Sequence, residues 1–380
     1  MVISPDNLTM NQIDLSVPVP LVSENFTSIE RTPWAGCALA SGIKREQAKS
    51  PSQKIGESWE VSCDPEMPSM IKSAPSFSLS QLIASRPSEC LSAGVTGSGR
   101  ISCDILIKLL NASSPLSLQL HPADDNISLK TNECGKPESW LVISADPGAG
   151  LYLGFSRPLS VTDLEKHLTT GTFTQDLLQF VPVKPGDYFE IEPHVPHAIG
   201  PGIVLLEPQR ILQGKSGKTW RLWDWNRKYN AAGELDPVNG KPRELHIQSS
   251  LKILDPSSQC GAGYVESLRR KPRREIISQG VIAEIFPANR WYQTISLQMT
   301  AGSRIKLLPS AGYACATVTS GSLWARGQKN ATISMNQGES FFMAAASLPN
   351  ELAATEKDSH IMLVVPAGQG VSDHGGNIFS

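Results

Sequence analysis

The sequence lacks the features that mark membrane proteins and nucleic-acid-binding proteins. No stretch of its 380 residues approaches the roughly 18 continuous apolar residues that a membrane span needs. Neither charge predominates, because Lys and Arg total 34, Asp and Glu total 36, and the net charge is -2. Such a balance provides no general attraction for nucleic acid or for an anionic membrane surface. We therefore expect neither a nucleic acid nor a membrane as a partner.

Cysteine pairs of the C-x-x-C type and a secretory signal are also lacking. The N-terminal residues show no basic segment followed by an apolar one. Seven cysteines, an odd number, are scattered at positions 37, 63, 90, 103, 134, 260 and 315. Cysteines distributed in this way are typical of reduced, mostly buried thiols. We therefore expect a cytoplasmic protein.

Glycine and proline, in contrast, are plentiful, with 30 and 28 residues. Short apolar runs of strand length alternate with turn residues between about 59 and 207, and again between about 275 and 370. Many short strands at this spacing predict a β-sandwich or a β-barrel. No glycine-rich phosphate loop of the P-loop type is present, so a bound phosphate would be held mainly by side chains.

The same pattern predicts how the chain is divided. Helices are expected near 78–91 and 160–180, because each segment begins with a serine that can cap a helix, and Gly171 is expected to split the second one. The predicted parts are an irregular N-terminal arm (1–25), a first β unit (26–255), a polar and basic linker (256–274) and a second β unit (275–380).

Four residues from three stretches of the first unit form a candidate metal site. Gln119 and His121 are two residues apart on a predicted strand, so their side chains project from the same face. Glu138 begins the next apolar strand, and His197 follows a Pro-Gly-Asp turn. His194 is a rival for this last position, although its place between two prolines favours the rim of the site.

This layout is typical of a cupin, a small β-barrel of the jelly-roll type. A set of Gln, His, Glu and His provides nitrogen and oxygen ligands, which suit Zn(II), with Fe(II), Mn(II) or Co(II) also possible. A second β-rich block follows, so the sequence predicts a mainly β protein of two cupin units with a small helical insertion.

Several motifs together resemble one family, the type I mannose-6-phosphate isomerases (phosphomannose isomerases) of the cupin superfamily. They extend over roughly residues 30 to 255 in the order and spacing of that family. The matching stretches are Gly56–Ser62, Leu106–Leu110, Leu116–Pro122, Gly135–Trp140, Val183–Gly200, Thr219–Arg227 and Arg243–His246.

The resemblance implies one zinc ion per chain and names its ligands. These would be Gln119, His121, Glu138 and His197. It also implies that the C-terminal cupin has lost its metal, which agrees with a block that contains His360 and His374 and shows no ligand pattern.

The resemblance further implies an active-site arginine, which is Arg221 here, and two lysines, Lys136 and Lys108. An aldose–ketose isomerase moves a proton between two carbons through an enediol, and this needs a general base. Lys136 and Glu207 are both candidates for that base, while Glu207 could equally be a structural partner of Arg210 or Arg221.

The expected substrate is a phosphorylated hexose, since the family interconverts mannose 6-phosphate and fructose 6-phosphate. Arg221 and Lys108 suit its negative charge, and Ser117 and Trp34 are further candidates for substrate binding. Alternatives are a cupin oxygenase or epimerase, a non-catalytic sugar-binding cupin, and an isomerase of unphosphorylated mannose or fructose. We expect a monomer or a weak homo-oligomer.

Overall fold

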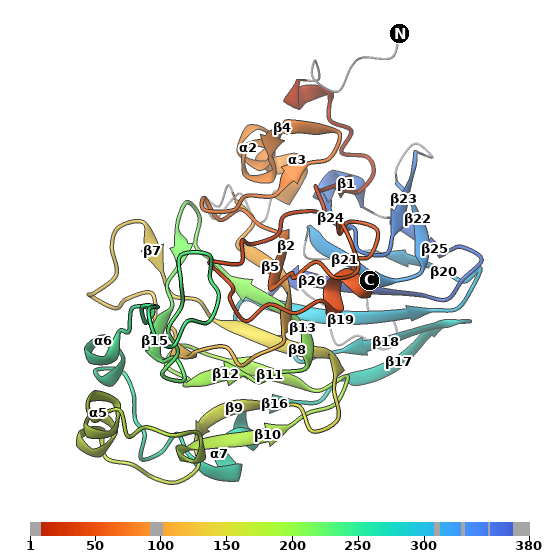
Figure 1. Cartoon of the computed structure of the whole chain (residues 1–380). Coiled ribbons are helices and arrows are strands. Elements are labelled where there is room, and N and C mark those ends of the chain that lie inside the picture. Colours follow the sequence, from red (N-terminus) through yellow and green to blue (C-terminus); the bar gives the residue numbers. More distant parts are fainter. Residues whose placement is uncertain (1–8, 92–101, 308–311, 328–330, 349, 368–380) are drawn as a thin grey trace.

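The computed structural model describes residues 9–91, 102–307, 312–327, 331–348 and 350–367. The fold is mainly β, which confirms the predicted fold class. Two sheets form the first part of the molecule, and two further sheets form the C-terminal part, which lies to the right in Figure 1. His374 is outside the described residues.

The first part contains a five-stranded and a six-stranded antiparallel sheet. The order in the five-stranded sheet is β10 (Leu178–Pro182), β9 (Gly150–Phe155), β12 (His197–Ile199), β6 (Leu118–Leu120) and β15 (Trp220–Trp223). The order in the six-stranded sheet is β16 (Arg269–Arg270), β11 (Tyr188–Ile191), β8 (Glu138–Ala145), β13 (Ile203–Arg210), β5 (Ile105–Ala112) and β2 (Glu57–Val61).

The C-terminal part contains a seven-stranded and a four-stranded sheet. The order in the seven-stranded sheet is β1 (Val19–Pro20), β24 (Ser340–Met343), β21 (Ala314–Ser320), β26 (Ser359–Pro366), β19 (Tyr292–Met299), β18 (Val281–Ile285) and β17 (Arg273–Ser278). The order in the four-stranded sheet is β20 (Arg304–Leu307), β25 (Asn350–Ala354), β22 (Ser322–Arg326) and β23 (Thr332–Asn336).

Short helices and two small ribbons complete the fold. The ribbons pair β3 (Met70–Ile71) with β4 (Ala74–Ser78), and β7 (Glu133–Cys134) with β14 (Ser216–Gly217). The helices are α1 (Ala38–Ser41), α2 (Leu79–Ser85), α3 (Pro87–Leu91), α5 (Val161–Thr170), α6 (Ile247–Leu251) and α7 (Gly261–Leu268), with 3-10 turns η2 (Met10–Gln12), η3 (Gln175–Leu177) and η5 (Ala345–Ser347).

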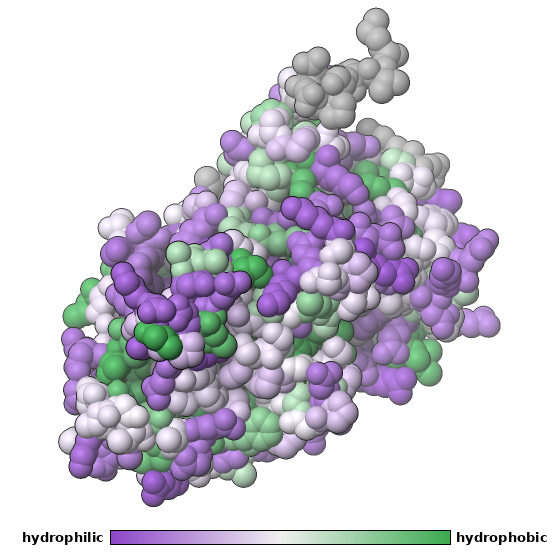
Figure 2. All heavy atoms as spheres, viewed as in Figure 1, coloured by the Kyte–Doolittle hydropathy of each residue, from purple (hydrophilic) through white to green (hydrophobic). Residues whose placement is uncertain are grey.

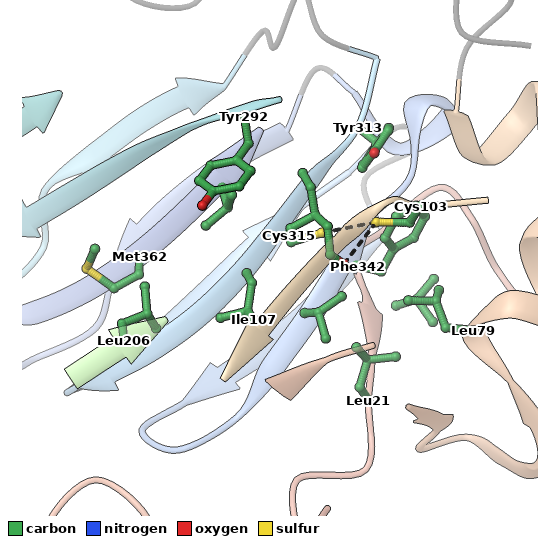
Figure 3. Packing of buried hydrophobic residues seen from close by; sticks show 14 of the residues in the cluster. Leu21, Leu79, Cys103, Ile107, Leu206, Tyr292, Tyr313, Cys315, Phe342 and Met362 are labelled. Carbon is green, nitrogen blue, oxygen red and sulfur yellow. Dashed lines mark hydrogen bonds between the residues drawn. The ribbon is translucent and has the colours of Figure 1, made fainter. Parts of the chain in front are cut away.

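Hydrophobic residues fill the spaces between the sheets. One cluster, which includes Leu151 and Leu205, lies between the five-stranded and six-stranded sheets. A second cluster joins the six-stranded sheet to the seven-stranded sheet, and in Figure 3 Leu206 of β13 lies near Met362 of β26. A third cluster, which includes Leu297, fills the C-terminal part. The six-stranded sheet is therefore covered on both faces.

This double burial explains why β5 and β13 are buried along their whole length. In β5, Ile107 and Leu109 point toward the C-terminal part, while Lys108 lies on the opposite face, because side chains alternate along a strand. In β13 the same alternation turns Leu206 toward the C-terminal part and Glu207 toward the interior of the first part. Polar residues thus enter the interior at alternate positions.

All seven cysteines are free, and four of them are buried. Cys103, just before β5, lies with its Sγ atom 3.8 Å from the Sγ atom of Cys315 on β21, within the cluster shown in Figure 3. The two thiols therefore belong to the apolar contact between the two parts of the molecule.

The predicted helices are shorter than expected. The range 78–91 forms α2 and α3, which break at Arg86 because a residue before proline disfavours the helical conformation. Helix α5 ends at Thr170, where Gly171 adopts a φ of 71° as a left-handed cap. The rest of the range 160–180 is the turn η3 and the beginning of strand β10.

The predicted linker and arm both contain regular structure. The range 256–274 includes α7 and β16, and β16 pairs with β11, where Arg270 also lies 2.7 Å from the Glu190 carboxylate. Several of the basic residues in the predicted linker are thus paired with acidic ones. In the predicted arm, Val19 of β1 pairs with Phe342 of β24, at the edge of the seven-stranded sheet.

No helix in the described ranges has the length and hydropathy to cross a membrane. On the face of the molecule in Figure 2, hydrophobic residues are interspersed with hydrophilic ones. Isolated apolar residues of this kind are ordinary on a protein surface.

Candidate metal centre

Three buried side chains converge inside the first part of the molecule, one directly after β6 and the other two at the beginnings of β8 and β12. His121, Glu138 and His197 place one ligand atom each within 4.8 Å of one another. The Nε2 atoms of His121 and His197 lie 3.2 Å and 3.4 Å from the Glu138 carboxylate oxygens. Among the described residues, neither Nε2 atom nor Glu138 Oε1 has a hydrogen-bond partner, which is unusual for buried polar atoms. A cation at this point would satisfy all three atoms.

Both imidazole rings are oriented by backbone carbonyls. His121 Nδ1 lies 3.0 Å from the Lys218 carbonyl oxygen, and His197 Nδ1 lies 2.8 Å from that of Val195. A carbonyl oxygen can only accept, so each Nδ1 carries the proton and each Nε2 presents its lone pair to the cluster. Burial, opposed in part by Glu138, lowers the pKa of His197 to about 3. The ring is therefore neutral at pH 7, as a metal ligand must be.

The fourth predicted ligand lies in register with this cluster. Gln119 of β6 is directly opposite His197 of β12, and on its other side it is opposite Arg221 of β15. Residues opposite each other in an antiparallel pair project from the same face. Arg221, Gln119 and His197 therefore form a row on one face of the five-stranded sheet.

A cavity of about 190 Å³ adjoins the cluster. It therefore has room for several waters or for a small ligand. It is lined by all seven of the predicted site residues that are not part of the buried cluster, namely Trp34, Lys108, Ser117, Gln119, Lys136, Glu207 and Arg221. The structure thus brings all ten predicted site residues together.

Lys136 and Glu207 differ in their surroundings. Lys136 Nζ lies 3.1 Å from Glu138 Oε2. Burial opposes its charge, but Glu138 and Glu207 outweigh burial and raise the pKa of Lys136, so it is an ammonium group in the metal-free site. The Glu207 carboxylate accepts hydrogen bonds from Trp140 Nε1 at 2.9 Å and from Gln209 Nε2 at 2.6 Å. Burial, together with the negative charge of Glu138, raises the pKa of Glu207 to about 8.

Glu207 does not pair with Arg210 or Arg221, the structural partners considered from the sequence. Arg210 meets Asp124 instead, and the two form a hydrogen bond of 3.0 Å through Nη1. Arg221 donates from Nε to Ser117 Oγ at 3.3 Å and from Nη1 to the Glu244 carbonyl oxygen at 2.9 Å.

Arg221 is a partly desolvated cation at the cavity. Within the described residues, no carboxylate lies within ion-pair distance of its guanidinium. Burial, with the nearby positive charge of Arg243, lowers the pKa of Arg221 to about 10, so it remains charged at neutral pH. A cation held in this way suits an anionic ligand.

Lys108 occupies the opposite wall of the cavity. Its Nζ atom lies 3.6 Å from Glu57 and 3.9 Å from Glu207, and 4.2 Å from the centre of the Trp59 ring. Trp59 Nε1 in turn donates to Glu57 Oε2 at 2.8 Å. These contacts hold the positive charge of Lys108 at one point of the cavity wall.

His194 lies at the margin of the centre. Its backbone adopts a φ of 74°, and its backbone N–H donates to the His121 carbonyl oxygen at 2.8 Å. Its own carbonyl oxygen accepts from Gln259 Nε2 at 2.9 Å. His194 therefore contributes its backbone to the loop beside the cluster, while the His197 side chain enters the cluster.

Sequence reasoning missed two residues of the centre. Gln209 Nε2 donates to Glu138 at 2.9 Å and to Glu207, and so joins the two carboxylates. Glu57 lines the cavity beside Lys108. Glu57 lies within one of the motifs quoted above, whereas a single glutamine in a buried strand has no local pattern that distinguishes it.

Known proteins of one kind are similar to this sequence. Residues 27–137 match the family described as phosphomannose isomerase type I, catalytic domain. A mannose-6-phosphate isomerase of Streptococcus mutans is 33% identical over 207 residues, which cover 54% of this chain and 59% of the relative. Mannose-6-phosphate isomerase ManA of Bacillus subtilis is 32% identical over 232 residues, covering 59% and 65%. The chain resembles the type I phosphomannose isomerases. Its matched stretch spans about three fifths of the length of these relatives.

Solved structures show that the fold is shared as well. The mannose 6-phosphate isomerase of Bacillus subtilis superposes with a TM-score of 0.71 at 22% identity, over 92% of this chain and 99% of that one. A putative mannosephosphate isomerase of Archaeoglobus fulgidus gives 0.67 at 22% identity, over 93% and 99%. A zinc-bound mannose 6-phosphate isomerase gives 0.64 at 16% identity, over 88% and 96%. The fold therefore extends over nearly the whole of these proteins.

Proposed function

We propose that this protein is a zinc-dependent mannose-6-phosphate isomerase, which interconverts mannose 6-phosphate and fructose 6-phosphate through an enediol. The observation that carries the proposal is the convergence of three unpartnered ligand atoms next to a cavity that Arg221 lines. The similarity to named mannose-6-phosphate isomerases supports the same reaction.

The residues present fit a zinc ion. Two neutral imidazoles, a carboxylate and the amide oxygen of Gln119 would form a mixed nitrogen and oxygen set, which Zn(II) accepts. When bound, the ion would supply a Lewis acid for the carbonyl oxygen of the sugar and for the negative charge that develops there.

For the proton transfer we propose Glu207 as the general base. Its carboxylate lines the cavity and is held by Trp140 and Gln209, so that it faces the substrate in a fixed orientation. A base in this position would take the proton from one of the two carbons and return it to the other. Lys136, which is bound to Glu138, is instead placed to donate a hydrogen bond to a substrate oxygen.

The phosphate group of the substrate would bind at Arg221. Its planar guanidinium offers a pair of parallel N–H donors to phosphate oxygens. Ser117 supports the guanidinium from one side and the Glu244 carbonyl from another, so that little side-chain freedom is lost on binding. Lys108 and Trp34 complete the surface around the sugar.

A coupled assay tests the proposal. Fructose 6-phosphate formed from mannose 6-phosphate is measured beside parallel reactions with unphosphorylated mannose and fructose, using protein with one equivalent of zinc. We expect turnover of the phosphorylated sugars. Equal turnover of the free sugars would contradict the role of Arg221, and the absence of any turnover would favour a sugar-binding protein.

A further inference from the structure

A tyrosine of the C-terminal part extends into the backbone that holds the metal centre. Tyr292, the first residue of β19, is fully buried between the seven-stranded and six-stranded sheets. Its hydroxyl donates to the Pro208 carbonyl oxygen at 2.8 Å and lies 3.0 Å from Ser139 Oγ. Since a tyrosine hydroxyl has only one proton, Ser139 is the donor in the second bond.

These two contacts lie directly behind the residues of the centre. Ser139 adjoins Glu138 on β8, and Pro208 stands between Glu207 and Gln209 on β13. Because side chains alternate along a strand, the side chains of Ser139 and Pro208 face the C-terminal part, while those of Glu138, Glu207 and Gln209 face the interior of the first part. One hydroxyl therefore holds two neighbouring strands at the positions that carry the centre.

The pairing of β8 with β13 has a gap at this point. The register passes from Leu206, opposite Leu141, to Gln209, opposite Glu138. Pro208 lies in the gap and has no N–H group to donate to a neighbouring strand. The Tyr292 hydroxyl therefore links the two strands where the backbone ladder does not.

Trp291, the residue before Tyr292, also contacts strand β13. The Arg210 guanidinium lies 5.4 Å from the centre of the Trp291 ring and is paired with Asp124. Asp124 Oδ1 also accepts from the backbone N–H of Gly135 at 3.0 Å, in the loop that leads to Lys136 and Glu138. The side chain of Asn289 fixes both aromatic residues, because its Oδ1 accepts from their backbone N–H groups at 2.9 Å.

We propose that Tyr292 is a positioning residue of the metal centre, so that the C-terminal part contributes to zinc binding without supplying a ligand. The inference rests on the proposed zinc site. Residues that orient ligands from behind change metal affinity by about 10- to 100-fold when they are replaced. Removal of the Tyr292 hydroxyl would release Ser139 and the Pro208 carbonyl, and so loosen the backbone behind Glu138 and Glu207, while the aromatic ring continues to fill its space.

The test compares the zinc affinity of metal-free wild-type protein with that of Tyr292→Phe, by competition with a chromophoric chelator at pH 7. The visible spectrum of the Co(II)-loaded proteins serves as a second readout of ligand geometry. Tyr313→Phe is the matched control, because Tyr313 is equally buried in the same cluster but lies against Cys103 and Cys315 (Figure 3). We expect zinc binding about 10- to 100-fold weaker in Tyr292→Phe, and unchanged in Tyr313→Phe.

Zinc affinity in Tyr292→Phe within twofold of wild type, with the same Co(II) spectrum, would overturn the inference. If Tyr292→Phe does not fold, Ser139→Ala decides instead, since it removes one of the two contacts from the other side. Unchanged affinity in Ser139→Ala would then overturn the inference. A wild-type protein that binds no zinc would overturn the proposed function itself, and the two failures are therefore distinguishable.

Discussion

Arg221 is directly opposite Gln119 in the pair of strands β6 and β15. A candidate metal ligand and a cation without a carboxylate partner among the described residues are thus neighbours on one face of a sheet. Under the proposed function, a sugar phosphate would meet a bound cation beside Gln119 and the Arg221 guanidinium at its phosphate, and both of these groups are positive. The spacing of these two residues is fixed by the sheet, so loop movements alter it little.

Replacement of Arg221 by alanine should reduce activity with little effect on folding. Hydrogen bonds to charged groups contribute about 1.5–3 kcal/mol, which corresponds to a loss of roughly 10- to 150-fold in kcat/KM. Steady-state kinetics with mannose 6-phosphate measures the loss, and thermal unfolding checks stability. Arg274→Ala, at an exposed position of β17, is the control. Wild-type kcat/KM in Arg221→Ala would refute its assigned role.

Removal of the metal should abolish activity reversibly. His121, Glu138 and His197 leave three buried ligand atoms without partners in the metal-free site, so that metal-free protein should also unfold at a lower temperature. Metal analysis, activity and thermal unfolding are compared before chelation, after chelation and after addition of one equivalent of Zn(II). Full activity in protein shown to contain no metal would rule out the proposed centre.

Glu207 should make the metal-free protein less stable as the pH rises. Its pKa in the folded protein is raised to about 8 from the ordinary 4.5, so its contribution is complete below pH 4.5 and is lost as the pH rises to about 8. The effect is on the order of a few kcal/mol, at about 1.4 kcal/mol for each unit of pKa.

The measurement is the free energy of unfolding of metal-free wild-type protein and of Glu207→Gln, by urea at pH 5 and at pH 8. The lowered pKa of His197 acts in the opposite direction at acidic pH, but it is common to both proteins and cancels in their difference. Wild type should lose stability relative to Glu207→Gln at pH 8. If the difference in the free energy of unfolding between the two proteins is the same at pH 5 and pH 8, the pKa of Glu207 is not raised.

A buried ion pair should make Lys44 indispensable for stability. Lys44 Nζ lies 2.7 Å from Glu60 of β2 and donates to the Gly338 carbonyl oxygen at 2.7 Å, and both side chains of the pair are fully buried. Lys44→Met would leave the Glu60 carboxylate buried without its cation, at a cost of about 3–5 kcal/mol. Urea unfolding measures this, and the double variant with Glu60→Gln should recover much of the loss. Losses below 1 kcal/mol would contradict this reading.

The candidate site could be predicted from the sequence because its residues fall in short motifs with a fixed period. Gln119 and His121 are two apart in a predicted strand, so that a common face is expected from the pleat, and the structure ends this strand one residue before His121. Gln209 was not predicted, because its importance arises from strand pairing between β8 and β13, which brings it opposite Glu138. Contacts of this kind join residues about 70 positions apart and leave no local signal.

For the fold, the mainly β class was predictable from the sequence, whereas the ends of the helices and strands were predictable only in part. The mainly β class follows from many short apolar runs. The helix expected over 160–180 breaks at Gly171 as predicted, but the following residues form η3 and then pair with β9 as strand β10, where a second helical piece was expected. The polar and basic segment 256–274 was expected to be a linker, because its partners, among them Glu190, are distant in the sequence. The division into two separate cupin units stays a prediction.

Strand β1 has a consequence for any attempt to shorten the protein. Val19 and Pro20 occupy the outer edge of the seven-stranded sheet, and the backbone N–H of Leu21 donates to the Ser340 carbonyl oxygen at 3.0 Å. A chain trimmed to begin at residue 26 would retain every candidate ligand and yet uncover the edge of β24. Bare strand edges recruit other chains, so such a fragment would be prone to self-association even with its chemistry intact.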